Sequence, residues 1–479
     1  MSKTIKKVNI PFYCYREMST HFENRGSEAI GFALCSKAVR ENDVYLFMKK
    51  FMPISYENTD SSPQYVKWKF KDMMPTIQEA VDNGLCIIKV HSHPNGFNNF
   101  SETDNNSDKE LFPAIYELTD EDSYHVSMIF LKNKSLISRY VDSEGTFKDI
   151  PKIIVPDDDI KIFHREEFVG TSSNFQRTAQ AFGSLTVQKL QKLKVAVVGA
   201  SGTGDPTVTQ LIRNGVGDIV IIDPKESRQV NMNRMSHLKA SDVMTKKPKA
   251  DVLRDHAIST GLNVKVKSIV KDVGDEEVIK ELSTCDIFVG CMDSVRGRHI
   301  LNKISSSYCV PFFDIGVQLK ADGYGGISSM WASYFYIKPG GPSLYSQKVY
   351  TMDKLQAETI KFDDPDHYKD LQKNDYIVNV DESAPAVISV NNIIAGLCVL
   401  DILGRIHPFR DESNSKFNSY RFNYCEYEPE FIEDHEPCSL FLKSVSEGDE
   451  ISLLRNSKGS KLNQYYSEDM NAKSTEKTV

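Results

Sequence analysis

The sequence has no cysteine pattern that would indicate a disulfide framework. Its 9 cysteines are scattered over 479 residues, and none belongs to a C-x-x-C pair. Scattered single cysteines are typical of proteins from a reducing compartment. The first residues contain no apolar signal core, and no run approaches 18 apolar residues. We therefore expect a cytoplasmic protein that does not span a membrane.

An excess of positive charge is also absent. The chain has 58 Lys and Arg residues against 66 Asp and Glu residues, which gives a net charge of −8. A chain of this charge, with a pI near 5.8, is unlike proteins whose main partner is nucleic acid. The composition is otherwise that of a globular protein, and the length indicates two or three domains.

The first part of the chain has the pattern of a compact α+β domain. Residues 1–150 contain apolar strands, a short amphipathic helix that ends at a glycine, and a closing hairpin over 124–141. Residues 151–170 contain prolines and an acidic run at 157–159, so we expect a linker there.

The second part alternates between strands and helices. From residue 171 to 410, β-branched runs recur with helical stretches between most of them, which predicts a doubly wound parallel sheet of the Rossmann-like α/β class. A long apolar helix is expected over 387–406. Residues 411–455 should extend this domain, and the polar residues 456–479 should form a disordered tail.

Two histidines end a buried strand in the first domain. Because side chains alternate along a strand, His91 and His93 point the same way. A carboxylate from the following segment, Asp104, would complete three ligands and leave a fourth tetrahedral position for water, as in catalytic zinc sites. An isolated H-x-H is also common as a pair of structurally satisfied histidines, so the wider pattern has to decide.

That pattern is H-x-H, seven residues, Ser, two residues, Asp. It resembles the signature of the JAMM (JAB/MPN) metalloproteases, a family that includes zinc deubiquitinases. The family also has a glutamate on an early strand, and Glu28 in "EAIGFAL" stands at the matching place. The resemblance covers about residues 5–145. It implies that Glu28 is the general base on a zinc-bound water and that Ser101 donates a hydrogen bond to the oxyanion.

The same resemblance implies Zn²⁺ ligands at His91, His93 and Asp104. The family hydrolyses a peptide or isopeptide bond next to the C-terminal glycine of a small protein. Asp108, Glu102 and the nearby asparagines are interpreted as polar loop residues. A scaffold that has lost its activity is the alternative for this domain.

A glycine-rich loop follows the first strand of the second domain. Gly199, Gly202 and Gly204 come after a buried run and open a helix, where backbone N–H groups can cradle phosphates. Asp223, at the end of the next strand, could accept from a ribose hydroxyl. The spacing is G-x-x-G-x-G, with Ser201 where the dinucleotide fingerprint has its middle glycine, so the loop alone does not identify the ligand.

The residues downstream favour a nucleoside triphosphate over NAD. "VNMNRM" contains Asn231 and Arg234, "KKPKADVLRD" offers Lys249 at a helix start, and "GCMDSVRGRHILN" has Asp293 at a strand end, with Arg298 on the next helix. Cations for a triphosphate and an acid for Mg²⁺ suit attack on an α-phosphate better than hydride transfer.

This order of motifs resembles the ubiquitin-activating superfamily of ThiF- and MoeB-like adenylyltransferases. The resemblance implies that Asp223 binds ribose, that Asn231, Arg234 and Lys249 bind phosphates, and that Asp293 binds Mg²⁺. It covers about residues 172–408.

An arginine on an N-terminal helix of the family often reaches the ATP of a partner subunit. Arg177 in "NFQRTAQAFG" stands at the corresponding place, which implies a homodimer. An ordinary solvated arginine is the alternative for this residue.

Two departures from the family pattern are visible. Lys225 stands where the second aspartate of a D-x-D pair is expected, and Ser343 and Ser346 replace the first pair of zinc-binding cysteines. No cysteine lies between residues 309 and 398, the span that often supplies a thioester nucleophile. A thioester cysteine would have to come from elsewhere, with Cys438 and Cys425 as candidates.

Together the two resemblances imply a bifunctional enzyme that uses Zn²⁺, ATP and Mg²⁺. A peptidase and an adenylyltransferase can act on the same C-terminal glycine of a ubiquitin-like protein, as in fused proteins of bacterial modification systems. Those systems often include a conjugating enzyme, and several act in antiphage defence. The alternative keeps adenylation, but of a peptide or sulfur-carrier protein and without an enzyme thioester.

Overall fold

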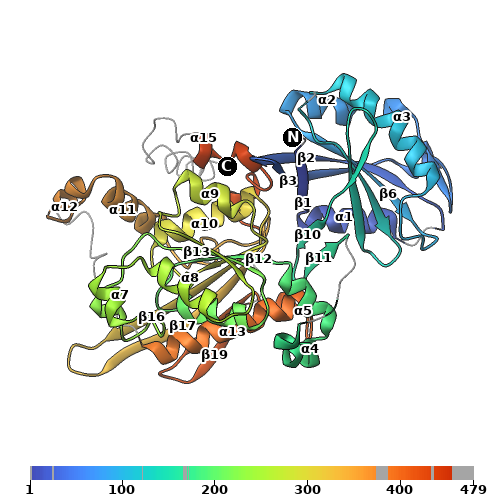
Figure 1. The fold of residues 1–479 in the computed structure, drawn as a ribbon. Helices are drawn as coiled ribbons and strands as arrows, with labels where there is room; N and C mark the ends of the chain where they lie inside the picture. The colour runs from blue at the N-terminus through green and yellow to red at the C-terminus, as the bar shows by residue number, and fades with distance from the viewer. Residues whose placement is uncertain are drawn as a thin grey trace. The chain divides into compact units, whose positions relative to one another are not determined.

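The computed structural model describes residues 3–23, 26–120, 122–165, 170, 172–373, 387–432 and 436–455. The chain divides into two compact units (Figure 1). Unit 1 consists of Met1–Glu167 with two short later segments, Ser307–Cys309 and Val445–Asp449. Unit 2 contains the rest of the chain. The predicted disordered tail, 456–479, lies outside the described residues.

A large mixed sheet forms the centre of unit 1. Its strands are β1 (Thr4–Asn9), β2 (Ile30–Arg40), β3 (Asp43–Pro53), β6 (Cys86–His93), β7 (Val126–Leu131), β8 (Leu136–Val141), β9 (Phe147–Asp149), β10 (Lys152–Pro156) and β11 (Ile160–His164). Among the described residues these nine strands follow the order β11-β10-β1-β3-β2-β6-β7-β8-β9. A small separate hairpin consists of β4 (Asp60–Ser62) and β5 (Tyr65–Lys67).

Helices cover both faces of this sheet. They are α1 (Phe12–Phe22), α2 (Met74–Asn83) and α3 (Glu102–Leu118). Side chains of α1 pack with Ile88 and Val90 of β6 in one apolar cluster, whereas α2 and α3 pack with Ile87 in a second cluster. Since neighbouring residues of β6 belong to different clusters, the strand is buried on both faces, and its second face lies under α3.

The predicted linker over 151–170 is wrong in its larger part. Residues 152–164 form the antiparallel hairpin of β10 and β11, and β10 pairs in parallel with β1. Ile153, Ile154 and Val155 are buried, so this stretch belongs to the core of unit 1. The prolines do not interrupt the strand, because Pro151 precedes β10 and Pro156 is its last residue. At the ends of a strand a missing backbone N–H is tolerated.

Unit 2 is built on a second sheet. Its strands are β12 (Lys194–Val198), β13 (Asp218–Ile222), β14 (Lys265–Ile269), β15 (Ile287–Gly290), β16 (Phe312–Ala321), β17 (Ile327–Ile337), β18 (Ser419–Asn423) and β19 (Glu428–Ile432). In the described part of the chain these eight strands have the order β14-β13-β12-β15-β16-β17-β18-β19. The first five are parallel and the last three pair antiparallel.

The helices of unit 2 connect these strands. Their bounds are α4 (Gln176–Phe182), α5 (Ser184–Gln191), α6 (Gly204–Arg213), α7 (Ala240–Met244), α8 (Lys249–Ser259), α9 (Glu276–Leu282), α10 (Val295–Ser307), α11 (Met352–Asp363), α12 (Pro365–Lys373), α13 (Ile388–Ile406), α14 (Ser439–Leu442) and α15 (Ser452–Arg455). The chain leaves β12 toward β13 and β14, then returns to β15 on the other side of β12. The strand order therefore reverses between β12 and β15, which is where ligands bind in open α/β sheets.

Of the described helices, α13 is long and apolar enough to cross a membrane by length and composition. However, 61% of its most apolar stretch is buried within the protein. It packs on α6 and on β16 and β17, as a core helix does. The C-terminal strands β18 and β19 lengthen the same sheet, so residues 419–432 are part of its core architecture.

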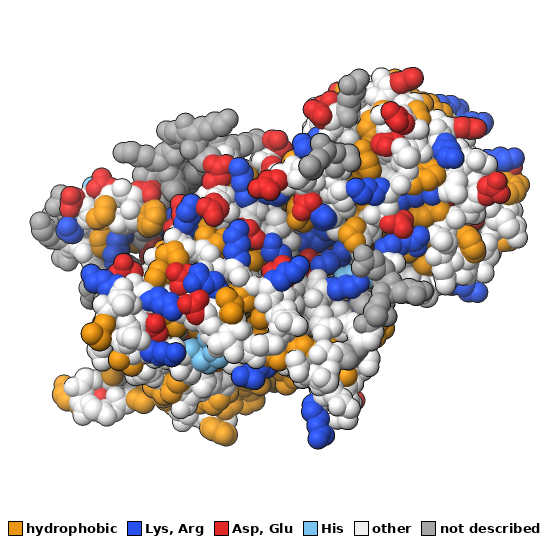
Figure 2. All heavy atoms as spheres, viewed as in Figure 1, with side chains coloured by type: hydrophobic (Ala, Val, Ile, Leu, Met, Phe, Trp, Pro, Cys, Tyr) orange, Lys and Arg blue, Asp and Glu red, His pale blue; other side chains and the backbone are white. Residues whose placement is uncertain are grey.

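Basic and acidic side chains are interspersed on the face drawn in Figure 2. This distribution accords with the modest net charge of −8. That nucleic acid is not a partner stays a prediction.

Candidate functional site

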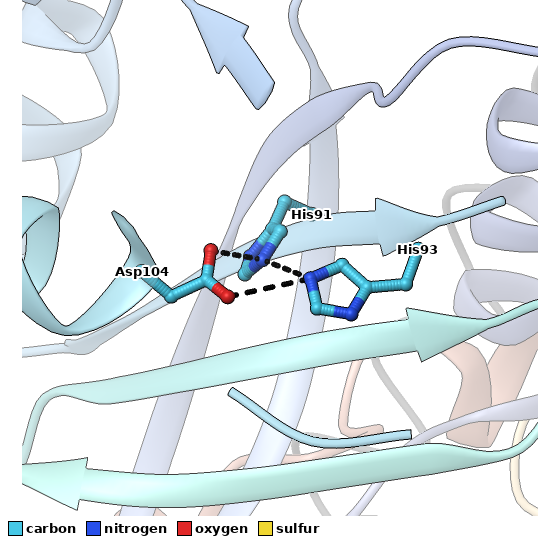
Figure 3. Close-up of side chains that lie close together, drawn as sticks. All are labelled: His91, His93 and Asp104. Atoms are coloured by element: carbon cyan, nitrogen blue, oxygen red, sulfur yellow. Dashed lines mark hydrogen bonds and ion pairs between the residues drawn. The ribbon is translucent and has the colours of Figure 1, made fainter. Parts of the chain in front are cut away.

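The structure brings together the three side chains that the H-x-H pattern singled out (Figure 3). His91 Nε2 lies 3.1 Å from His93 Nε2 and 2.9 Å from Asp104 Oδ1. His93 Nε2 lies 3.4 Å from Asp104 Oδ2. The histidines end β6, Asp104 comes from the first turn of α3, and all three are buried. Among the described residues, no other group of metal-ligand side chains comes as close together.

The geometry of this cluster fits a tetrahedral zinc ion. Ligand atoms at about 2.0–2.1 Å from zinc lie about 3.3–3.4 Å from one another in a tetrahedron, close to the three distances between these side chains. His93 Nδ1 lies 2.9 Å from the carbonyl oxygen of Phe97. Since that bond needs a proton on Nδ1, it leaves the lone pair of Nε2 for a metal. The cluster supplies three ligands, so a fourth position would remain for water.

Ser101 contacts Asp104 in this structure. Its hydroxyl donates to Asp104 Oδ2 at 2.7 Å and accepts from the backbone N–H of Asp104 at 3.1 Å. The second of these contacts and the bond from the Ser101 backbone N–H to Asp104 Oδ2, at 2.7 Å, form a capping box at the start of α3. Burial opposes ionisation of Asp104, but hydrogen bonds from His91, His93 and Ser101 outweigh it and hold the pKa of this carboxyl below its usual range. Ser101 therefore orients the Asp104 carboxylate, and its role toward an oxyanion stays a prediction.

Glu28 lies beside the metal-ligand cluster. Ala29, the next residue, donates its backbone N–H to Ser92 Oγ and accepts from the backbone N–H of Ser92, both at 3.0 Å, which extends the contact of β2 with β6 as far as Ala29. Glu28 is only 4% exposed. Burial raises its pKa to about 7, with Asp104 adding to the rise and His93 opposing it. A carboxylate titrating near neutral pH is suited to general base catalysis.

The interpretation of Asp108 as a polar loop residue is wrong. Asp108 lies one turn after Asp104 on α3 and is fully buried. It accepts from Lys89 Nζ and from Arg139 Nη2, both at 2.6 Å. The Arg139 guanidinium also lies 3.9 and 3.7 Å from two phenylalanine ring centroids. Lys89 is two residues before His91 on the same face of β6, so this ion triplet fixes α3 to the strand next to the ligands.

The spacing of these residues carried a signal that sequence reasoning missed. Lys89 extends the alternation of His91 and His93, and Asp108 repeats Asp104 at i+4. The strand face therefore offered three polar positions in phase, and the helix face offered two.

A second site lies in unit 2, at the reversal point of the strand order. A cavity of about 910 Å³ is lined there by the glycine loop after β12, by Asp223 after β13 and by Asp293 after β15. The glycines are needed for close packing: a Cβ on Gly199 would lie 2.4 Å from the carbonyl oxygen of Cys291, and one on Gly204 would lie 1.9 Å from that of Gly199. Among the described contacts no side chain caps the start of α6, so its N-terminus is available to an anion.

Asp223 and Lys249 form one wall of the cavity. Asp223 Oδ2 accepts from the backbone N–H of Ala200 at 2.9 Å, and Oδ1 accepts from that of Lys225 at 2.8 Å. Lys249 is 7% exposed, so it is not a surface residue, and its Nζ lies 3.9 Å from Asp223 Oδ2. Burial lowers the pKa of Lys249, and Lys225 and Arg234 add to this effect. The cavity therefore contains clustered positive groups that a phosphate chain would neutralise.

Asn231 and Arg234 reach the same cavity from the segment after β13. Asn231 is buried, and its Oδ1 accepts from the backbone N–H of Arg228 at 3.0 Å. Arg234 is half-buried and donates to the carbonyl oxygen of Val230 at 2.6 Å. Asn231 thus shapes the turn, whereas Arg234 keeps part of its guanidinium available to a ligand.

A cluster of three side chains, which the sequence did not indicate, connects three segments that line the cavity. Asp205, in the first turn of α6, accepts from His237 Nδ1 at 2.6 Å. The His237 ring stacks on His256 of α8, with 3.4 Å between centroids. The cluster of Asp205, His237 and His256 therefore links the glycine loop, the Arg234 segment and α8, the helix that carries Lys249.

Asp293 and Arg298 also line the cavity. Asp293 is exposed, as a magnesium ligand would be. Arg298 Nε lies 3.1 Å from Asp314 on β16, a fully buried carboxylate whose pKa is raised by burial against the opposing effect of the arginine. Asn302 accepts from the backbone N–H of Leu344 at 3.0 Å, which is a structural contact.

Other cationic side chains of the cavity were not singled out in the sequence. Lys348, Lys354 and Arg421 line it and come from segments far along the chain. No local pattern marks them, because only the fold brings them to the reversal point.

Arg177 is exposed on α4 and is not among the residues that line the cavity. Of the two candidate thioester cysteines, Cys425 is exposed and Cys438 is buried. Burial raises the pKa of the Cys291 thiol to about 12, and it raises that of Cys398 well above its usual value. These two thiols are therefore poor nucleophiles at neutral pH.

Comparison with curated proteins gives relatives of unit 2. The sulfur carrier protein ThiS adenylyltransferase of Bacillus subtilis is 26% identical over 153 residues, which are 32% of this chain and 43% of that protein. The adenylyltransferase and sulfurtransferase UBA4 of Debaryomyces hansenii is 27% identical, covering 44% of this chain and 46% of that protein. The SAMP-activating enzyme E1 of Haloferax volcanii is 30% identical, covering 26% and 45%. The chain therefore spans less than half the length of these relatives.

Among solved structures, Escherichia coli MccB aligns with 56% of this chain and 74% of its own, at a TM-score of 0.44 and 19% identity. The model of the ThiF family matches residues 174–439, more than half of the chain. The protein therefore belongs to the ThiF family.

Proposed function

We propose that unit 2 is an ATP-dependent adenylyltransferase that activates the C-terminal carboxylate of a ubiquitin-like protein. The observation that carries this proposal is the cavity at the strand reversal, where Arg234, Lys249 and Arg298 surround an uncapped helix N-terminus with Asp293 at the rim. Membership of the ThiF family and the names of the relatives support it.

In this proposal the cavity residues bind and orient ATP with Mg²⁺. Asp223 accepts from the ribose, Arg234 and Lys249 neutralise the phosphates, and Asp293 holds the metal ion. A carboxylate oxygen of the bound C-terminus attacks the α-phosphorus, and the bond from that phosphorus to the bridging oxygen of pyrophosphate breaks. The products are an acyl-adenylate and pyrophosphate, so the carboxylate gains a good leaving group.

The alternative substrate is a peptide or sulfur-carrier protein that is adenylated without an enzyme thioester. It is favoured by the lack of cysteine between residues 309 and 398 and by the name of the Bacillus subtilis relative. If a thioester forms, Cys425 is the better candidate because it is exposed whereas Cys438 is buried.

Intact-mass analysis tests these proposals. We would incubate the protein with ATP, Mg²⁺ and a ubiquitin-like protein from its own genomic neighbourhood, with and without reductant. A gain of one AMP on the small protein would support adenylation, and a reductant-sensitive adduct on the enzyme would support a thioester. If neither forms and no ATP–pyrophosphate exchange occurs, the adenylation proposal fails.

We further propose that unit 1 is a zinc peptidase or isopeptidase acting at the same C-terminal glycine. The supporting observation is the arrangement of His91, His93 and Asp104 around one point, with Glu28 beside it. When bound there, zinc would lower the pKa of a coordinated water. Glu28 would take a proton from that water and pass it to the leaving amine.

The test for this activity is cleavage of a ubiquitin-like protein with a short C-terminal extension, followed by mass spectrometry without ATP. Loss of the extension that stops in Glu28→Gln would support the peptidase. Cleavage that continues unchanged in Glu28→Gln would refute the assigned role.

The remaining features of the proposal concern setting and partners. We propose a cytoplasmic homodimer in a bacterial modification pathway, such as one of antiphage defence, with a conjugating enzyme as a further partner. In such a dimer Arg177 would reach the ATP site of the partner subunit. The measurement that tests this is light scattering, since a monomer at micromolar concentration with full activity would exclude it.

A further inference from the structure

One polar side chain that lines this cavity has no assigned role, and its amide nitrogen has no hydrogen-bond partner among the residues that the structure describes. Asn391 lies in the first turn of α13 and is 3% exposed. Its amide nitrogen, Nδ2, is buried and makes no hydrogen bond with any described atom. A buried amide without a partner is unfavourable, so most native proteins avoid it unless a ligand or water completes the contact.

The position of Asn391 points to such a ligand. The side chain lines the cavity, and its Nδ2 lies 3.4 Å from where a Cβ on Gly202 would be. Ser201, the neighbouring loop residue, also lines the cavity and has a buried hydroxyl without a described partner. Two unsatisfied polar atoms therefore belong to side chains that line the same cavity, one on the glycine loop and one beside Gly202, from segments about 190 residues apart.

We infer that Asn391 and Ser201 form an oxyanion subsite that binds a phosphoryl oxygen of the nucleotide. This inference rests on the proposed adenylation function and adds two binding residues to it. An amide N–H₂ and a hydroxyl are both donors, which matches a phosphoryl oxygen. The glycine loop and the N-terminus of α6 attract the same kind of group from the backbone side.

The two residues also account for a feature of the loop sequence. Ser201 takes the position at which the usual fingerprint has a glycine, so its hydroxyl can supplement the backbone donors there. Asn391 supplies a donor from the opposite side of the loop, through a helix that packs against α6.

The test compares ATP and adenosine binding by isothermal titration calorimetry with the full-length protein and Mg²⁺. The variants are Asn391→Ala, Asn391→Asp and Ser201→Ala, with Asn392→Asp as the matched control, because Asn392 is exposed on the same helix. We expect Asn391→Ala to weaken ATP binding about tenfold, since a hydrogen bond to a charged group is lost. Asn391→Asp should weaken it further because it adds a negative charge beside a phosphate. Ser201→Ala should lose a few-fold.

Adenosine affinity separates a phosphate contact from a general disturbance of the cavity. It should remain within about twofold of the wild-type value in every variant, as should ATP affinity in Asn392→Asp. Equal ATP affinity in Asn391→Asp and wild type would overturn the inference, and so would a parallel loss for adenosine. If Asn391→Asp does not fold, Ser201→Ala and Asn391→Ala decide by the same criteria. If the wild type itself binds no ATP, the proposed function fails and this inference fails with it.

Discussion

Replacing Glu28 by glutamine should stabilise the metal-free protein at neutral pH, although it should abolish peptidase activity. The pKa of Glu28 is raised from 4.5 to about 7 in the folded protein, chiefly by burial. Between these two values the folded protein keeps a proton that the unfolded chain has lost. The stability of the wild type therefore falls as pH rises through this window.

The size of the effect follows from the same shift. A rise from 4.5 to about 7 corresponds to roughly 3 kcal/mol, and screening by nearby water reduces this to roughly 2 kcal/mol. Glutamine does not ionise, so Glu28→Gln should recover this amount above pH 7 and almost nothing near pH 4.5. A gain of about 2 kcal/mol raises the melting temperature of a domain of this size by about 4–8 °C.

Scanning calorimetry of the metal-free protein between pH 4.5 and 8 measures this difference. The transition that moves when Zn²⁺ is added belongs to unit 1 and is the one to follow. Glu110→Gln is the matched control because Glu110 is exposed on α3, and it should leave the transition unchanged. A melting temperature that is lower in Glu28→Gln than in wild type at pH 8, or a gain that does not depend on pH, would refute the reasoning.

Four other outcomes are expected. Asp108→Asn should destabilise unit 1 by about 3–5 kcal/mol and weaken zinc binding, because Lys89 and Arg139, two buried cations, lose their carboxylate. Calorimetry and metal analysis check this, and an unchanged melting transition of unit 1 would contradict it. Lys249→Met should weaken ATP binding about ten- to a hundredfold in calorimetric titration, whereas an unaltered affinity would exclude a phosphate contact. His237→Ala should weaken ATP binding severalfold, because the Arg234 segment loses its link to α6. The double variant with His237→Ala and Asp205→Asn should bind ATP about as well as the Asp205→Asn single variant, since both changes remove the same contact. A chelator should stop peptide cleavage and leave ATP binding in the absence of Mg²⁺ intact, and loss of both would mean that the two sites are not independent.

Local pattern was sufficient for the parts of the protein that depend on neighbouring residues. The alternation of β6 placed His91 and His93 on one face. The run before Gly199 marked β12, and the strand–helix alternation that follows predicted the parallel sheet. These inferences succeeded because the direction of side chains within a strand or helix is set by a few consecutive residues.

Pattern failed where long-range pairing overrides local signals. Prolines suggested a linker at 151–170, yet β10 is held by parallel pairing with β1, about 145 residues earlier. Asp108 was interpreted as a polar loop residue, whereas it lies on α3 and its partners come from β6 and β8.

The sequence by itself indicated the family of the second domain, the candidate residues of both sites and most of the elements that present them. Only the tertiary structure decided which distant groups complete those sites. It brought Lys89 and Arg139 to Asp108, His256 to His237, and Asn391 to the glycine loop. The physical reason is that these contacts depend on how sheets and helices pack. A buried polar group is unfavourable without a hydrogen-bond partner, and packing decides which partners are within reach.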